Sequence, residues 1–322
     1  MNITAIILSG GSGKRMGGPV AKQYMDLQGK PVLYYSIKAF EESVVNDIII
    51  VTAAGDEQMV MENIVKANGF KKVRACVAGG AERADSVLAG LRACGGDKVY
   101  SEMSGIVSMP ADPLAGDAAP ELNEFEERRR RVSESAPDVE TKTVADTDRF
   151  VLIHDGARPF IKSQVINNIA AEAMKTGAAM AAVQSKDTVK LAQYGAVAET
   201  TERPNTYLAQ TPQAFRLDMI RNAYERVVER YFSGAGTSTA PAPGTATGGN
   251  FDDFIKNLQQ AVATSQANKE REKKMATLTD DAAIFAEIYP NIKITLVDGG
   301  YDNLKLTTQE DLDYANWKLG RK

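Results

Sequence analysis

A glycine-rich segment with two adjacent basic residues follows the first apolar run of the chain. The segment reads Ser9-Gly-Gly-Ser-Gly-Lys-Arg-Met-Gly17 and comes directly after Ile3–Leu8. Glycines let backbone N–H groups approach an anion closely, and Lys14 and Arg15 add positive charge. We therefore predict a phosphate-binding loop here, whose backbone contacts come from Gly10, Gly11 and Gly13. The alternative interpretation is a tight glycine turn with no ligand.

The spacing of the glycines narrows the class of ligand. Gly11, Gly13 and Gly17 give G-x-G-x-x-x-G, which is one residue longer than the dinucleotide-binding fingerprint and disfavours an NAD-dependent dehydrogenase. A Walker loop is disfavoured because arginine, not serine or threonine, follows the Gly-Lys pair. Lys22 comes a few residues later and is expected to reach the same phosphates, although a single lysine is more often only a surface residue.

A second glycine pair precedes a predicted helix. The segment Gly79-Gly-Ala-Glu-Arg-Ala-Asp-Ser86 lies between an expected strand at 72–77 and an expected helix at 83–93. Gly79 and Gly80 allow a flat ligand to approach the backbone closely, and Ser86 is placed to donate a hydrogen bond from the first turn. The alternative is a plain helix-capping turn.

An acidic and a basic residue three positions apart follow a third apolar run. Phe150–His154 is expected to be a strand, and Asp155 and Arg158 come directly after it. A carboxylate suits Mg²⁺ that is bridged by phosphates, and a guanidinium suits an oxyanion. His154 adjoins the strand and is expected to be a structural hydrogen-bonding residue.

Alternating strand and helix patterns must position these groups. The predicted strands are 3–8, 47–52, 72–77, 150–154 and 178–183, and the predicted helices are 31–40, 57–68, 83–93 and 164–175. This alternation indicates an α/β fold with a doubly wound sheet, whose ligands bind beyond the carboxyl ends of the strands. The two glycine-rich segments, and Asp155 with Arg158, follow predicted strands and are therefore expected at those ends.

An alternating polar and apolar stretch follows the last of these strands. Residues from about 186 to 210 are expected to form a protruding β-arm with a turn at Gly195. Because a hairpin beside a compact sheet needs its edges covered, we expect a homodimer. Further along, Thr279 is expected to cap a helix, and Lys305 is expected on a short strand before the final helix.

The amino-acid composition limits which classes of function the protein can have. The 322 residues carry 38 Lys and Arg against 42 Asp and Glu, a net charge of −4, so we expect no nucleic-acid partner. The basic run at 128–131 is flanked by glutamates and is interpreted as a solvated helix, with a nucleic-acid-binding patch as the alternative. It lies in one of two expected surface insertions, 95–148 and 233–275, the second of which begins with a Gly/Ala/Pro/Thr-rich stretch.

Cysteine and histidine counts exclude two further classes. Cys76, Cys94 and a single histidine cannot supply a disulfide framework or a Cys/His zinc site. A reduced, cytoplasmic protein is expected. The apolar run at 3–8 is too short for a signal peptide or a membrane span, so no membrane association is expected.

The ordered set of motifs resembles the 2-C-methyl-D-erythritol 4-phosphate cytidylyltransferases of the non-mevalonate isoprenoid pathway. The resemblance rests on short segments that run in family order along the chain. They are Gly-Gly-Ser-Gly-Lys-Arg-Met16, Ala-Lys-Gln-Tyr24, Glu-Arg-Ala-Asp-Ser-Val87, His-Asp-Gly-Ala-Arg-Pro159, Lys-Asp-Thr-Val-Lys190, Gln-Thr-Pro-Gln213, Thr-Asp-Asp-Ala282 and Asn-Leu-Lys-Leu-Thr307. The family implies a single Rossmann-like nucleotidyltransferase domain over 1–322, CTP as substrate, a divalent cation such as Mg²⁺, and a homodimer whose arms reach the neighbouring sites.

The resemblance also implies roles for individual residues. Arg15 and Lys22 would neutralise the triphosphate, with Arg203 and Lys305 as further catalytic residues. The loop from Gly79 to Ser86, with Gly80, Ala81 and Ser86 as contacts, would hold cytosine, and Asp155 would serve ribose, metal or substrate. The residues that would surround the sugar phosphate are Asp155, Arg158, Thr188, Arg203, Thr211, Thr279 and Lys305.

Three departures from the family keep alternatives open. Ser9-Gly10 stands where the family usually has two alanines, Ala81 replaces a common acidic residue, and Tyr207 replaces a tryptophan. The nearest alternative is a ribitol-5-phosphate cytidylyltransferase, which needs the same CTP-binding residues. A non-catalytic nucleotide-binding scaffold is the second alternative, although it predicts a lost catalytic charge and none is lost.

Overall fold

The computed structural model describes residues 2–11, 21–94, 149–232 and 276–321. By their contacts the residues form two compact units, one of residues 1–218 with 291–322 and one of residues 219–290. The two expected insertions, 95–148 and 233–275, lie outside the described residues, as do Gly13 and Arg15. The single-domain organisation stays a prediction.

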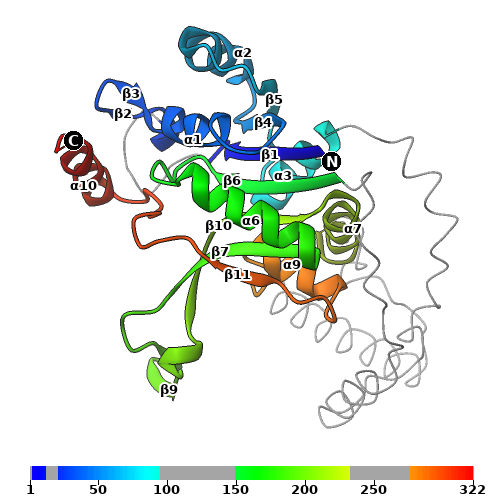
Figure 1. Ribbon diagram of the computed structural model, residues 1–322. Coiled ribbons are helices and arrows are strands. Elements are labelled where there is room, and N and C mark those ends of the chain that lie inside the picture. Colours follow the sequence, from blue (N-terminus) through cyan, green and yellow to red (C-terminus); the bar gives the residue numbers. More distant parts are fainter. Residues whose placement is uncertain (1, 12–20, 95–148, 233–275, 322) are drawn as a thin grey trace, which may run out of the picture. The chain divides into compact units, whose positions relative to one another are not determined.

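A seven-stranded sheet forms the centre of the first unit (Figure 1). Its strand order is β11 (Thr295–Asp298), β7 (Ala178–Gln184), β10 (Tyr207–Arg216), β6 (Arg149–Asp155), β1 (Asn2–Ser9), β4 (Asp47–Thr52) and β5 (Val73–Ala78). β10 runs antiparallel to both of its neighbours, and every other pairing is parallel. The sheet therefore aligns the carboxyl ends of β1, β4, β5 and β6 at one edge.

Helices cover both faces of this sheet. α1 (Val32–Glu41) and α6 (Ser163–Thr176) share one core with Ile7 of β1. α3 (Arg83–Ala93) packs on the opposite face, where a Cβ at Gly90 would lie 2.7 Å from Ile6. Successive residues of β1 thus face different helices, and because both faces are covered its sequence is continuously apolar. The doubly wound prediction is confirmed.

The helix expected at 57–68 is present but irregular. It begins as α2 (Glu57–Val60), continues with π-type hydrogen bonding in η3 (Met61–Val65), and closes as the 3₁₀ turn η4 (Lys66–Asn68). Gly69 then adopts φ 68°, the left-handed conformation that commonly ends a helix.

A small apolar cluster joins two segments that carry predicted lysines. The 3₁₀ turn η2 (Lys22–Tyr24) leads into the short strands β2 (Asp26–Leu27) and β3 (Lys30–Pro31). Leu27 packs with Leu306 and with Leu312 of α10 (Gln309–Leu319). The chain near Lys22 and the chain near Lys305 are therefore held by one hydrophobic cluster.

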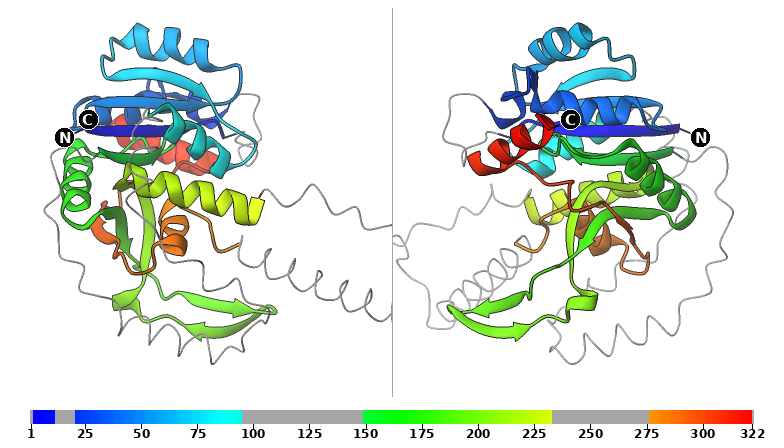
Figure 2. Two further views of the ribbon diagram at one scale, coloured as in Figure 1. Left: turned by 90° about the vertical axis from the view of Figure 1, so that its right-hand side faces the viewer. Right: turned by 60° about the vertical axis from the view of Figure 1, so that its left-hand side comes forward.

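The expected arm is shorter than predicted. Its hairpin consists of β8 (Lys190–Gln193) and β9 (Ala196–Thr200), followed by the 3₁₀ turn η5 (Arg203–Asn205). Figure 2 shows this hairpin protruding from the main sheet. Residues 207–210, which we assigned to the arm, are instead the first residues of β10, and the backbone of 207–209 pairs with β7.

The second unit contains α7 (Leu217–Val227, which starts in the first unit), η6 (Val228–Phe232) and α9 (Asp281–Ile288). The buried hydroxyl of Tyr224 donates to Asp281. The side chain of Asp280, not that of Thr279, caps α9 by accepting from the Ala283 N–H at 2.9 Å, so the capping prediction was wrong by one residue. None of the helices described here is both long and apolar enough to cross a membrane.

Candidate active site

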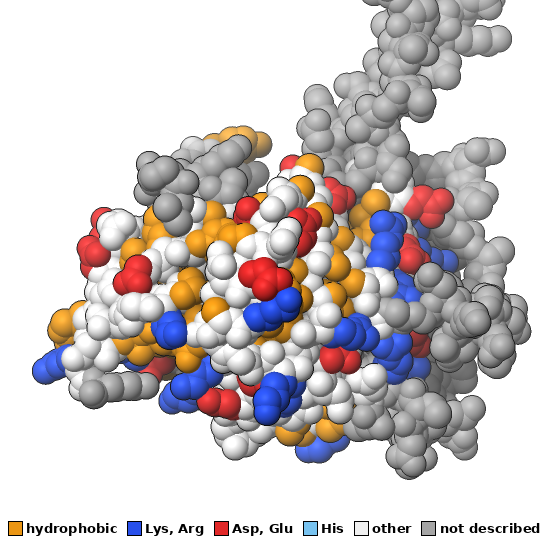
Figure 3. Space-filling view, turned by 90° about the horizontal axis from the view of Figure 1, so that it is seen from above, with side chains coloured by type: hydrophobic (Ala, Val, Ile, Leu, Met, Phe, Trp, Pro, Cys, Tyr) orange, Lys and Arg blue, Asp and Glu red, His pale blue; other side chains and the backbone are white. Residues whose placement is uncertain are grey.

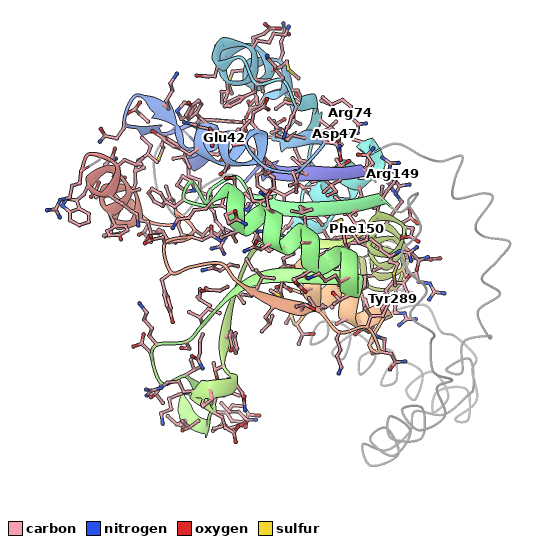
Figure 4. The ribbon with its side chains drawn as sticks, viewed as in Figure 1. Glu42, Asp47, Arg74, Arg149, Phe150 and Tyr289 are labelled. Atoms are coloured by element: carbon pink, nitrogen blue, oxygen red, sulfur yellow. The ribbon has the colours of Figure 1, made fainter. Side chains whose placement is uncertain are left out.

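A cleft of about 340 Å³ lies at the carboxyl edge of the sheet. The opposite edge is marked by the ion pair of Asp47 and Arg74, 3.8 Å apart, near the starts of β4 and β5 (Figure 4). The cleft is lined by Leu8, Ser9, Gly10, Gly11, Lys22, Gln23, Gly80, Ala81, Glu82, Arg83, Ser86, Asp155, Ala157 and Lys305. Three segments that sequence alone placed at strand ends therefore converge on one site.

The first segment continues from β1. A Cβ at Gly10 would lie 2.9 Å from the carbonyl oxygen of Thr52, so only glycine lets the chain pass this close to β4. Lys22 lines the cleft from η2. The neighbouring Gln23 side chain is buried and donates to the Ser9 carbonyl at 2.7 Å. This bond fastens the turn that carries Lys22 to the end of β1.

The second segment is the Gly79–Ser86 loop. A Cβ at Gly79 would lie 2.6 Å from Ser86 Oγ, and one at Gly80 would lie 2.2 Å from Asp85 Cβ. The Ser86 hydroxyl accepts from the Gly80 N–H and donates to the Glu82 carbonyl, each at 3.2 Å. Ser86 therefore shapes the loop from within, and its predicted donation to a ligand would compete with the bond to Glu82.

The third segment places Asp155 between cations. Lys305 Nζ lies 2.9 Å from Asp155 Oδ2, and Arg158 Nε lies 3.7 Å from the same oxygen. Burial opposes charge on this carboxyl, but the positive charges of Lys305, Arg83 and Arg158 outweigh it and hold the pKa of Asp155 well below its usual range. Asp155 is thus an ionised carboxylate at neutral pH.

Lys305 itself does not lie on a strand. Residues 303–307 have no regular secondary structure, so the strand predicted for them was wrong. Their backbone instead meets the site through the Leu306 N–H, which donates to the Ala157 carbonyl at 2.9 Å.

Thr211 of β10 forms hydrogen bonds with two consecutive residues at the end of β6. Its hydroxyl accepts from the Asp155 N–H at 3.1 Å and forms a second hydrogen bond, of 3.0 Å, with His154 Nδ1. His154 is fully buried, and burial lowers the pKa of its imidazole to about 3. A neutral, hydrogen-bonded His154 matches the structural role that we expected.

Two predicted residues form a separate pair on the arm. Arg203 Nη2 donates to Thr188 Oγ1 at 2.9 Å, and neither residue lines the cleft of its own chain. Thr279 is an exposed residue of the second unit. The structure therefore brings together Gly10, Gly11, Lys22, Gly80, Ala81, Ser86, Asp155 and Lys305, with Arg158 and Thr211 in contact with Asp155.

Sequence reasoning overlooked several residues of the site. Gln23, Glu82 and Arg83 line the cleft, although each stands inside a segment that had already been singled out.

Among the described residues, no group of three His, Cys, Asp or Glu side chains forms a metal cluster. On the face seen from above, acidic and basic side chains are interspersed (Figure 3).

Two glycine-containing loops that meet at the carboxyl edge of a mostly parallel sheet define an α/β protein of the doubly wound class, whose ligands bind at this edge. The family model IspD, 2-C-methyl-D-erythritol 4-phosphate cytidylyltransferase, matches residues 3–101 and 132–240. The chain belongs to this family. Residues 102–131, between the two matched stretches, fall within the first expected insertion.

Individual relatives agree with the family model. The chain is 34% identical to the 2-C-methyl-D-erythritol 4-phosphate cytidylyltransferase of Lachnoclostridium phytofermentans, over 97% of this chain and 94% of that protein. It is 31% identical to the protein of the same name from Shouchella clausii, over 100% and 98%. These relatives are transferases, which removes the support for the non-catalytic scaffold alternative.

Solved structures confirm the fold. The 4-diphosphocytidyl-2C-methyl-D-erythritol synthase of Anaerococcus prevotii superimposes with a TM-score of 0.61 at 24% identity, covering 99% of this chain and 96% of that one. The Francisella tularensis 2-C-methyl-D-erythritol 4-phosphate cytidylyltransferase gives a TM-score of 0.55 at 22% identity, covering 99% and 100%.

Proposed function

We propose that this protein transfers the cytidylyl group of CTP to 2-C-methyl-D-erythritol 4-phosphate in isoprenoid precursor biosynthesis. A phosphate oxygen of the polyol attacks the α-phosphorus of CTP. The bond from that phosphorus to the β-phosphate oxygen breaks, and pyrophosphate leaves. The observation that carries this proposal is the single cleft lined by Lys22, Asp155, Lys305 and two glycine loops, in a chain of this family.

The reaction needs charge compensation more than proton transfer. The attacking phosphate is already an anion, so no general base is required, and the main barrier comes from bringing two polyanions together. Lys22 and Arg15 are assigned to the triphosphate, where preorganised cations stabilise the charge that develops on the leaving pyrophosphate. The loop at 80–86 is assigned to cytosine.

Asp155 is assigned to a divalent cation as well as to the polyol. Mg²⁺ is commonly held by one or two carboxylates together with phosphate oxygens and water. The cleft fits this pattern, because it is lined by Asp155, which is ionised, and by Glu82. When bound, the cation would neutralise phosphate charge. Lys305 and Arg158 keep the Asp155 carboxylate in place between them.

The arm is assigned to the partner subunit's site. Thr188 and Arg203 are paired with each other and do not line the cleft of their own chain. In a homodimer they would contact the sugar phosphate bound to the partner. The family resemblance also implies sugar-phosphate contacts for Thr211 and Thr279. Free Cys76 and Cys94 agree with a reducing, cytoplasmic location.

The test is pyrophosphate release with CTP and Mg²⁺ against a panel of polyol phosphates. We expect turnover with methylerythritol phosphate and a CDP-linked product of the matching mass. Faster turnover with ribitol 5-phosphate would change the substrate and keep the reaction class. No pyrophosphate with any member of the panel would overturn the proposed function.

A further inference from the structure

Two buried amide side chains join the segment that carries Lys305 to strand β10. Asn303 Nδ2 donates to Gln210 Oε1 at 3.0 Å and to the Thr211 carbonyl at 2.9 Å. Gln210 Nε2 donates in turn to the Gly300 carbonyl at 3.2 Å. Asn303 is 1% exposed and Gln210 is 7% exposed. Water therefore does not replace these bonds easily.

The segment is packed tightly against the Gln210 amide. A Cβ at Gly299 would lie 2.1 Å from Gln210 Oε1, so the backbone passes directly over this group. Residues 303–307 have no strand ladder to hold them. Their position depends on the amide pair, on the Leu306 bond to Ala157 and on packing of Leu306 in the cluster with Leu27, and Thr307 at the end of the segment also bonds Asp311.

The same segment determines where two cations of the cleft lie. Arg158 Nη1 donates to the Asn303 carbonyl at 2.7 Å, and Lys305, two residues further along, pairs with Asp155. A shift of the Asn303 backbone would therefore move both cations that flank the Asp155 carboxylate.

We propose that Gln210 and Asn303 are positioning residues that set Lys305 and Arg158 against Asp155 for phosphoryl transfer. The inference rests on the proposed function, since it assigns Lys305 a part in that reaction. Neither amide lines the cleft, so both act through the residues that do.

Two single variants each remove the hydrogen bond between Asn303 and Gln210, one by changing the donor and the other by changing the acceptor. Asn303→Ala deletes both donated bonds, and Gln210→Met keeps the side-chain length while deleting the amide. We expect each to lower kcat/KM by about 10²-fold, because a displacement of about 1 Å in a reacting group costs that much. The loss should appear in kcat and in the KM for the polyol phosphate, with the KM for CTP within about twofold of wild type.

Because the two residues act as one unit, the double variant should fall no more than about threefold below either single variant. Asn46→Ala is the matched control. Its amide accepts from the Ile3 N–H at 2.8 Å, so it also joins a side chain to the backbone of the same sheet, but at the opposite edge. Asn46→Ala should lose stability without this loss of turnover.

Backbone hydrogen exchange gives a readout that does not depend on activity. Exchange at 303–307 should quicken by about tenfold or more in Asn303→Ala and Gln210→Met, and not in Asn46→Ala, if those bonds hold the segment. Unchanged exchange, near-normal turnover, or multiplicative losses in the double variant would each overturn the proposal. If wild-type protein releases no pyrophosphate with any polyol phosphate, the proposed function fails, and the exchange result still decides whether the pair positions Lys305.

Discussion

In the cleft, Lys305 and Arg158 both lie within 4 Å of Asp155, and the carboxylate is only 13% exposed. On the arm, Arg203 bonds the single hydroxyl of Thr188, and every residue of β8 and β9 is exposed. The cleft cations are therefore fixed by a dense network within one chain. Within the part of the chain that the structure describes, the side chain of Arg203 makes this one hydrogen bond, so its orientation is less constrained.

The two regions also differ in apolar exposure. The buried core lies under the cleft, whereas Val197 on the arm is 65% exposed and Tyr194 at its tip is 98% exposed. A two-stranded ribbon of this kind is not stable alone in water. The difference fits the proposed homodimer, in which the cleft would be preorganised within one subunit and the arm would be ordered by contact with a second copy of the chain.

Lys22→Ala should produce the largest effect, because it removes a preorganised cation of the cleft. We expect kcat/KM to fall by about 10²-fold or more, with thermal unfolding unchanged. Arg15→Ala should behave in the same way. Lys38→Ala is the matched control, because Lys38 is an exposed lysine that pairs only weakly with Glu42, at 3.9 Å, and it should stay within about twofold of wild type. Near-normal turnover of Lys22→Ala would place the triphosphate elsewhere.

Arg203→Ala should give a smaller loss, of about 30-fold, because in the proposed dimer this exposed side chain would be ordered only by the partner's site. Mixing Arg203→Ala with Lys22→Ala protein tests which site Arg203 serves. If it serves the partner, half of the dimers become heterodimers with one intact site of two, and activity returns to about a quarter of wild type.

The same mixture tests whether the cleft of one subunit and the arm of the other form one active site. If Arg203 serves its own subunit, each site of the heterodimer lacks one residue and no activity returns. A protein that stays monomeric at micromolar concentration would also exclude a shared site. Analytical ultracentrifugation of each parent and of the mixture provides the control.

The fold could be predicted where burial is uniform. β1, β4, β6 and β7 are continuous apolar runs because helices cover both faces of the sheet. β10 was missed because its buried residues include Gln210, Thr211 and Gln213, whose polarity is typical of an exposed strand. Their partners lie in other segments, such as His154 for Thr211, and sequence alone does not give those pairings.

The site could be predicted where a motif follows a strand end, as with Gly10, Ser86 and Asp155. The secondary structure that carries each site residue was harder to predict. Lys305 was expected on a strand, but a loop held by Asn303 and Gln210 carries it. These amides stand 93 residues apart, and neither has a local pattern that indicates its partner.

The pH dependence of the free energy of unfolding tests whether His154 is buried and neutral in the folded protein. Its folded-state pKa is about 3, while an unfolded histidine titrates near ~6.5, so between these values the unfolded state binds more protons and the free energy of unfolding falls as pH falls. We expect a loss of about 1.4 kcal/mol between pH 7.5 and 5.5 in urea unfolding. The chain has one histidine, so His154→Gln should remove this slope. An unchanged slope in the variant would mean that other groups titrate.

Tyr194→Asn at the tip of the arm should produce the smallest effect. Tyr194 and Gly195 have φ values of 52° and 78° and connect β8 to β9 as a two-residue turn, a conformation in which Asn-Gly is preferred. Because tyrosine is strained there and 98% exposed, asparagine should stabilise the hairpin by roughly 0.5–1 kcal/mol. Amide exchange over 190–200 should slow, and turnover should stay within about twofold of wild type. A weaker dimer with unchanged hairpin exchange would instead make the Tyr194 ring a contact with the partner subunit, and would extend the shared surface from Arg203 to the tip of the arm.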